Sequence, residues 1–124
     1  MDLTPVIPSG RQVIESYGPG GFRVSGRAFA TSILIFPDQT LAWNVRDAAA
    51  INAGDLAPVL AHGGIEILLL GCGAQLLQVA PELRQTLRAA GIGVDPMDTG
   101  AACRTYNVLM AEGRPVAAAL IRPG

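Results

Sequence analysis

Hydrophobic and polar positions follow two different patterns in the two halves of this chain. In the N-terminal half, short runs rich in β-branched and aromatic residues are separated by glycine and proline, which is typical of strands joined by tight turns. We expect Gly26 to form a bulge just before one of these runs. The expected strands are 12–17, 22–24, 27–30, 32–36 and 41–45. This half therefore predicts an antiparallel meander.

In the C-terminal half, short runs rich in apolar residues alternate with amphipathic segments. Strands are expected at the mainly apolar runs 65–70 and 116–121 and at the short segment 92–95. Pro81 opens a helix between the first two runs and Gly91 ends it, while a second helix separates the last two. The order strand, helix, strand, helix, strand is typical of a parallel sheet with right-handed crossovers.

The second of these helices has clear start and stop signals. Asp98 and Thr99 are residue types that cap helix N-termini, and apolar residues recur at helical spacing after them. Gly113 followed by Pro115 predicts the end of the helix, because glycine takes the left-handed turn and proline cannot continue the helix.

A shorter helix is expected at 56–61, and its start is open between two caps. Asn52 and Asp55 can both cap it, and Pro58 favours the later start because proline fits only in the first turn. His62 lies where this helix ends, and capping is the role that we expect for it.

Together the two patterns predict an α/β fold in a single domain spanning residues 1–124. An N-terminal antiparallel meander is joined to a C-terminal βαβαβ unit with parallel strands. A chain of 124 residues can bury a core without disulfide or metal staples, and with half its residues hydrophobic and 15% charged it is not a disordered type.

The charged residues exclude several function classes. A net charge of −1 provides no basic surface for nucleic acid or for an anionic membrane. All nine basic residues are arginines, so a Schiff-base lysine and a phosphate-binding P-loop lysine are both excluded.

The sequence also predicts where the protein works. The segment 1–10 is polar and broken by Pro5 and Pro8, unlike a signal peptide, and no apolar run approaches the ~20 residues that span a bilayer. Two cysteines do not make a disulfide framework. We therefore expect a cytoplasmic protein without membrane insertion.

Ligands of open parallel sheets bind beyond the carboxyl ends of the strands, and three segments should meet there. The ligand-binding candidates that they supply are Gly71, Cys72, Gly73, Asp98, Thr99, Cys103 and Arg104. The glycine pair is a poor match to a dinucleotide loop, since Leu76 stands where a third glycine belongs. A tight turn after a buried strand explains the glycines as well.

A cysteine mechanism is the sharpest chemical hypothesis at this edge. The helix dipole and Arg104 would favour a thiolate at Cys103, and Cys72 would lie nearby. No histidine is placed to act as a base, and cysteine is often simply a small buried residue. We assign no catalytic residue, no metal site and no cofactor, because the ligand-type residues show no spacing on one element.

Several motifs resemble one known family along nearly the whole chain. The C-terminal ones are Met97-Asp98-Thr99, Ala101-Ala102, Thr105-Tyr106-Asn107, Leu109, Glu112-Gly113-Arg114 and Val116-Ala117-Ala118-Ala119-Leu120. The upstream ones are Tyr17-Gly18, Phe22, Trp43, Leu69-Leu70-Gly71-Cys72-Gly73, Pro81-Glu82-Leu83 and Gly91-Ile92-Gly93-Val94. This chain resembles the small single-domain proteins of unknown function related to a mitochondrial respiratory complex I assembly factor and an adipogenesis-associated protein.

The resemblance implies a compact three-layer α/β domain and a non-enzymatic, assembly-factor-like interaction role. The implied partners are protein subunits of a membrane respiratory complex. The family more usually has another small residue at the position of Cys72, which speaks against a two-cysteine mechanism. The alternative hypothesis is a small-molecule or anion-binding enzyme at the sheet edge. The oligomeric state stays open, with a homo-oligomer among the options.

Overall fold

The computed structural model describes residues 10–74 and 77–123. Its strands are β1 (Ile14–Gly18), β2 (Gly21–Val24), β3 (Arg27–Phe29), β4 (Ser32–Ile35), β5 (Thr40–Trp43), β6 (Ile67–Gly71), β7 (Gly93–Met97) and β8 (Val116–Leu120). Its helices are the 3₁₀ turns η1 (Ala48–Ala50) and η2 (Ala53–Leu56) and the α-helices α1 (Ala57–His62), α2 (Pro81–Ala89) and α3 (Thr99–Ala111). Within the described residues, no helix is both long and apolar enough to cross a membrane.

The strands form two sheets. Strands β1, β2 and β3 make an antiparallel sheet, which we call sheet A, and the other five make sheet B in the order β5-β4-β8-β6-β7. In sheet B, β6 pairs in parallel with β7 and with β8, which confirms the predicted βαβαβ unit. The predicted meander is divided between the sheets, because β4 and β5 join sheet B through the antiparallel pairing of β4 with β8.

Burial explains why the meander divides at this point. All four residues of β4 are buried, so this strand needs a covering layer on both faces, as a central strand of sheet B has. Strand β3 is exposed or half-buried along its length, so one covered face is enough for it.

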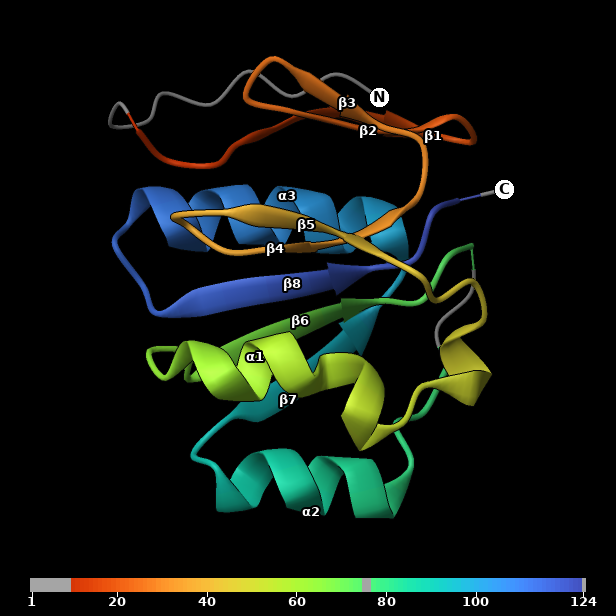
Figure 1. Cartoon of the computed structure of the whole chain (residues 1–124), viewed down its shortest axis with the longest axis vertical. Coiled ribbons are helices and arrows are strands. Elements are labelled where there is room, and N and C mark those ends of the chain that lie inside the picture. The colour runs from red at the N-terminus through yellow and green to blue at the C-terminus, as the bar shows by residue number, and fades with distance from the viewer. Residues whose placement is uncertain (1–9, 75–76, 124) are drawn as a thin grey trace.

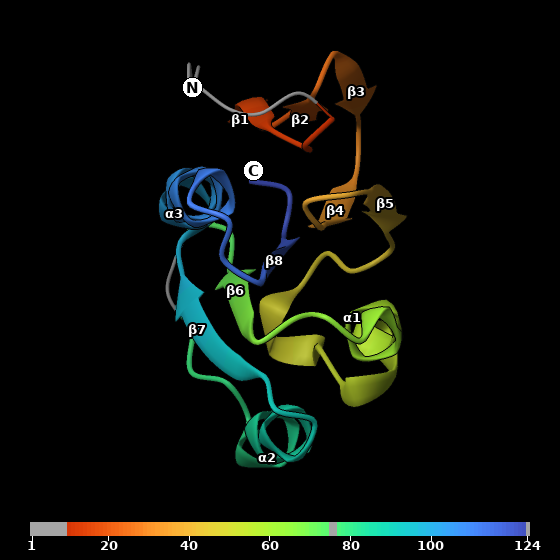
Figure 2. The ribbon, with the colours of Figure 1, turned by 90° about the vertical axis from the view of Figure 1, so that its left-hand side faces the viewer.

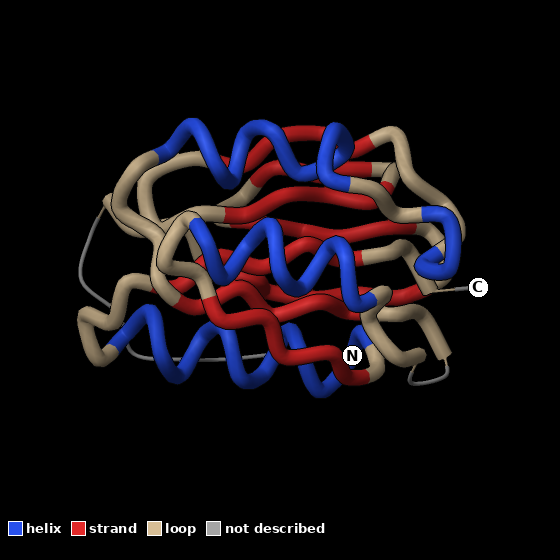
Figure 3. The backbone as a smooth tube through the Cα atoms, turned by 90° about the horizontal axis from the view of Figure 1, so that it is seen from below, coloured by secondary structure: helices blue, strands red, loops and turns tan. Residues whose placement is uncertain are grey.

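The two sheets and the helices are stacked in three layers. Sheet A and α3 lie on one face of sheet B, and α1 and α2 lie on the other, as Figures 1 and 2 show. Figure 3 shows helices on both sides of the strands. Neighbouring residues of β4 serve opposite cores, with Leu34 in the core beneath α1 and α2 and Ile33 in the core beneath α3 and sheet A. The predicted three-layer α/β fold is confirmed.

The prediction of a bulge at Gly26 is wrong, because this residue lies in a tight hairpin turn. Val24 pairs with Arg27, so Ser25 and Gly26 form the whole loop, with φ angles of 45° and 85°. A two-residue turn with two positive φ angles matches the twist of the strands that it joins. The irregularity in sheet A lies in β1 instead, after Ile14.

The later start predicted for the short helix is only partly right. Asn52 caps η2 by accepting a hydrogen bond from the Asp55 N–H, and the Asp55 side chain accepts one in return from the Asn52 N–H. This reciprocal pair is a capping box, so both candidates belong to one start signal. Helix α1 then continues from Ala57 with Pro58 in its first turn, as predicted.

Two side chains of α3 attach this helix to the start of sheet A. The Asn107 Oδ1 accepts a hydrogen bond of 3.0 Å from the Ile14 N–H, and its Nδ2 donates one of 2.8 Å to the Ile14 carbonyl. The Tyr106 hydroxyl donates to the Gln12 carbonyl over 3.0 Å. Asn107 therefore pairs with β1 as a neighbouring strand would, although it belongs to a helix.

We expect Asn107→Ala to lower the free energy of unfolding by about 2–4 kcal/mol, because it leaves the buried N–H and C=O of Ile14 unsatisfied. The measurement is urea denaturation followed by fluorescence of Trp43. Val108→Ala is the matched control on the same helix, since Val108 is 57% exposed and should change stability little. Equal stability of the two variants would contradict the structural role of Asn107.

Candidate functional site

The carboxyl edge of the parallel strands brings several of the candidate residues together. The Gly73 N–H donates to the Thr99 Oγ1 over 2.9 Å, and the Thr99 N–H donates to the Gly73 carbonyl over 2.9 Å. The Thr99 hydroxyl in turn donates to the Ile121 carbonyl over 2.8 Å. Thr99 therefore ties the segments that follow β6 and β8 to the first turn of α3, and we call this contact the Thr99 seam.

The residues of the Thr99 seam pack closely against one another and leave little space for a ligand. A Cβ atom at Gly71 would lie 3.0 Å from the Leu120 Cδ2 and 3.1 Å from the Thr99 Cα, so a side chain here would push these neighbours apart and glycine favours the close approach. Thr99 is 1% exposed, and its hydroxyl both accepts and donates within the seam. These groups serve the closure of the sheet edge.

Asp98 and Arg104 lie at the exposed surface of α3. The Asp98 Oδ1 accepts a hydrogen bond of 2.8 Å from the Ala101 N–H, which confirms Asp98 as the helix cap. The Arg104 Nη1 donates to the Tyr17 hydroxyl over 3.0 Å and so links α3 to β1. Both side chains therefore have local structural contacts.

The structure contradicts the thiolate hypothesis for Cys103. Burial raises the pKa of this thiol to about 12, and the charge of the neighbouring Arg104 lowers it by less than burial raises it. The thiol is therefore protonated at neutral pH. Cys72 is also buried, with its Sγ 3.6 Å from the Leu70 carbonyl oxygen, and neither cysteine forms a disulfide.

His62 is the last residue of α1, but its side chain has a contact that the sequence did not predict. Its Nε2 lies 3.0 Å from the Asp38 Oδ1, and its ring stacks on Phe36 with centroids 4.7 Å apart. Gly63 provides the left-handed cap of the helix instead. His62 therefore joins α1 to the loop between β4 and β5.

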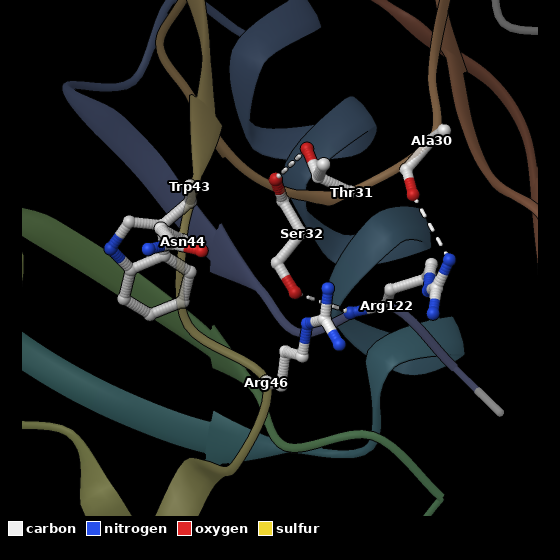
Figure 4. A pocket seen from close by; sticks show the side chains of 7 residues that line it. All are labelled: Ala30, Thr31, Ser32, Trp43, Asn44, Arg46 and Arg122. Atoms are coloured by element: carbon white, nitrogen blue, oxygen red, sulfur yellow. Dashed lines mark hydrogen bonds between the residues drawn. The ribbon is translucent and has the colours of Figure 1, made fainter.

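A cavity of about 240 Å³ opens at the same edge of sheet B, in its antiparallel half (Figure 4). Strands β5 and β8 both run antiparallel to β4, so they leave the sheet where β4 begins. We call this space the β4 cavity; its lining residues are Ala30, Thr31, Ser32, Trp43, Asn44, Arg46 and Arg122.

Sequence reasoning missed the residues of this cavity. Arg46 and Arg122 follow β5 and β8 closely, and a charged residue just beyond a strand end was the available signal. That signal could not be used, because the sequence does not show that β5 and β8 flank β4 in sheet B and end where β4 begins. The lining contains no His, Cys, Asp or Glu, so its chemistry suits an anion better than a metal ion.

Comparison with known proteins shows a family that spans nearly the whole described chain. A family described as protein of unknown function (DUF498/DUF598) matches residues 14–121. An uncharacterized protein of Rhodobacter capsulatus is 38% identical over 114 residues, which are 91% of this chain and 86% of that protein.

Assembly factors are also similar to this chain. NADH dehydrogenase (ubiquinone) 1 alpha subcomplex assembly factor 3 of Danio rerio is 38% identical over 112 residues, which cover 90% of this chain. The human protein of the same name is 33% identical over 111 residues. The chain spans 64% of the length of the first and 60% of the second, so each has further sequence outside the match.

Solved structures share the fold. The crystal structure of an outer membrane protein from Bartonella henselae has a TM-score of 0.86 and 40% identity, and the match covers 93% of this chain and 98% of that one. The solution structure of a Bordetella pertussis protein described as a Mth938-like domain has a TM-score of 0.85 and 32% identity, with coverage of 100% and 94%. These likenesses confirm the three-layer arrangement.

We expect alkaline pH to destabilise the fold through Cys103. The unfolded chain releases this proton near pH 9, whereas the folded chain holds it to about pH 12. The contribution of this group to the free energy of unfolding is therefore fully present below pH 9 and is lost progressively as the pH rises from 9 to about 12. The loss approaches ~1.4 kcal/mol per pH unit from this one group.

The measurement is the free energy of unfolding at several pH values from 8 to about 11, within the range between the two pKa values. Burial also raises the pKa of Tyr106, so the informative quantity is the difference between the wild type and Cys103→Ala. The variant should show the shallower decline. Parallel pH profiles would contradict a buried, protonated Cys103.

Proposed function

The chain belongs to the family described as protein of unknown function (DUF498/DUF598), and from this membership we propose that it is a non-enzymatic, assembly-factor-like interaction domain acting in the biogenesis of respiratory complex I. The observation that carries the proposal is the extent of the similarity to the named assembly factors, which runs over about nine tenths of the chain. The part that is shared is therefore a whole folded unit with both of its cores.

The geometry supports a binding role more than catalysis at the predicted edge. The Thr99 seam uses its polar groups to close the sheet, and the Cys103 thiol is protonated at neutral pH. Asp98 and Arg104 stabilise the ends and contacts of α3. These residues maintain the shape of a surface, which is what a domain that holds another protein during assembly requires.

We place the protein in the cytoplasm, with membrane subunits of the respiratory complex as its protein partners. A net charge of −1 offers no general attraction to anionic lipid, so contact with the membrane would come through those subunits.

The test is deletion of the gene in a host that respires through complex I. We expect less assembled complex I on native gels and slower oxidation of deamino-NADH by membranes, because an assembly intermediate loses its binding partner. Succinate oxidation is the internal control, and expression of the wild-type chain should restore complex I. Unchanged complex I during growth that depends on it would refute the assembly role.

A second candidate function is that of a small-molecule or anion-binding enzyme at the carboxyl edge of sheet B. The observation that favours ligand binding there is the β4 cavity, whose lining residue Arg122 directly follows Ile121 of the Thr99 seam. The cavity residues are candidates for binding a ligand and not for catalysis.

A further inference from the structure

The charged residues that line the β4 cavity are both positive. Arg46 comes from the segment after β5 and Arg122 from the segment after β8, and no acidic residue lines the cavity with them. The chain as a whole has a net charge of −1, so this local positive charge is not a consequence of a basic protein. Two guanidinium groups beside one cavity create a site of positive potential.

The two arginines differ in how they are held. One Arg122 guanidinium nitrogen donates to the Ala30 carbonyl over 3.0 Å, which fixes the group beside the cavity and leaves further N–H donors for a ligand. Arg46 makes no hydrogen bond or ion pair within the described residues. In Figure 4 its guanidinium lies on the same side of Ser32 as Arg122. Arg46 can therefore turn toward a bound group without breaking a native contact.

Ser32 adds a neutral donor to the cavity. This residue is 3% exposed, and its Oγ accepts a hydrogen bond of 2.9 Å from the Arg122 N–H. In the part of the chain that the structure describes, the Ser32 hydroxyl donates to no acceptor. Buried polar groups usually have all their hydrogen bonds formed, and a ligand atom that accepts the hydroxyl proton would satisfy this donor.

Two backbone carbonyls at the cavity are already engaged as acceptors. The Ala30 carbonyl accepts from Arg122, and the Ser32 carbonyl accepts from the Thr31 hydroxyl over 2.8 Å. The Trp43 Nε1 donates to the Asp55 carbonyl, which fixes the indole ring as an apolar wall. Asn44 also lines the cavity, and its amide can donate as well as accept. The guanidinium groups and the Ser32 hydroxyl supply unused donors, and the ligand that these donors suit is an acceptor-only anion.

We propose that the β4 cavity binds the carboxylate or phosphate group of a small metabolite, held by Arg46, Arg122 and the Ser32 hydroxyl. Planar guanidinium groups pair with either oxyanion through two parallel hydrogen bonds. A volume of about 240 Å³ suits a small molecule better than a segment of protein. This proposal does not rest on the assembly role. It is argued from the hydrogen-bond donors that line the cavity, whereas the assembly role is argued from the similarity to the family.

The experiment is a calorimetric titration of the full chain with two probes, inorganic phosphate and succinate, at constant ionic strength. We expect saturable binding of at least one probe. Arg46→Gln should weaken that binding about tenfold or more, since a charged hydrogen bond is removed. Arg88→Gln is the matched control, because Arg88 is exposed on α2 and away from the cavity. It should bind as the wild type does.

Ser32→Ala tests the neutral donor, and we expect it to weaken binding severalfold without a change in charge. Arg122→Gln removes the Ala30 contact as well, so its unfolding midpoint is measured beside its affinity. Binding of phosphate alone or of succinate alone identifies the oxyanion and supports the site. No saturation by either probe up to about 10 mM, or equal affinity of Arg46→Gln and the wild type, would overturn it. None of these readouts depends on complex I.

Discussion

Helix α3 packs against both sheets, so the polar groups on its buried faces must find partners inside the protein. Asn107 meets this demand on the side of sheet A by bonding both backbone groups of Ile14. Thr99 meets it on the side of sheet B by joining the ends of β6 and β8. The rest of the fold depends on these two contacts, because they fix the position of α3 relative to the strands of both sheets.

The same contacts explain why the parallel half of the sheet edge is closed and the antiparallel half is open. Glycine at position 71 lets Thr99 approach the end of β6, and α3 covers the seam. In the described residues that follow β8 no helix begins, and the residues that follow β5 and β8 line the β4 cavity instead. A shape-determining seam and a donor-lined cavity therefore share one edge, so the proposed interaction role and the proposed anion site are compatible in one domain.

Local sequence signals predicted most of the elements, and the errors have physical causes. The helix signals around Asp98 and Pro81 were sufficient because capping and proline chemistry act within one turn. The interpretation of Gly26 failed because a bulge and a two-residue turn both need glycine, and only the pairing of Val24 with Arg27 distinguishes them. The interpretation of Cys103 as a small buried residue is confirmed, and the thiolate alternative failed because burial outweighs the neighbouring charge; burial depends on the distant strands that pack on the residue.

The sequence by itself determined the type and order of the elements, the parallel crossover unit and the absence of lysine chemistry. These properties follow from periodicity, turn residues and composition, which act locally or simply by count. Only the tertiary structure decided that the meander divides between two sheets, that Thr99 seals one part of the edge, and that Arg46 and Arg122 flank one cavity. Those outcomes depend on which strands lie side by side, and strand pairing is a long-range choice made by the burial of whole faces.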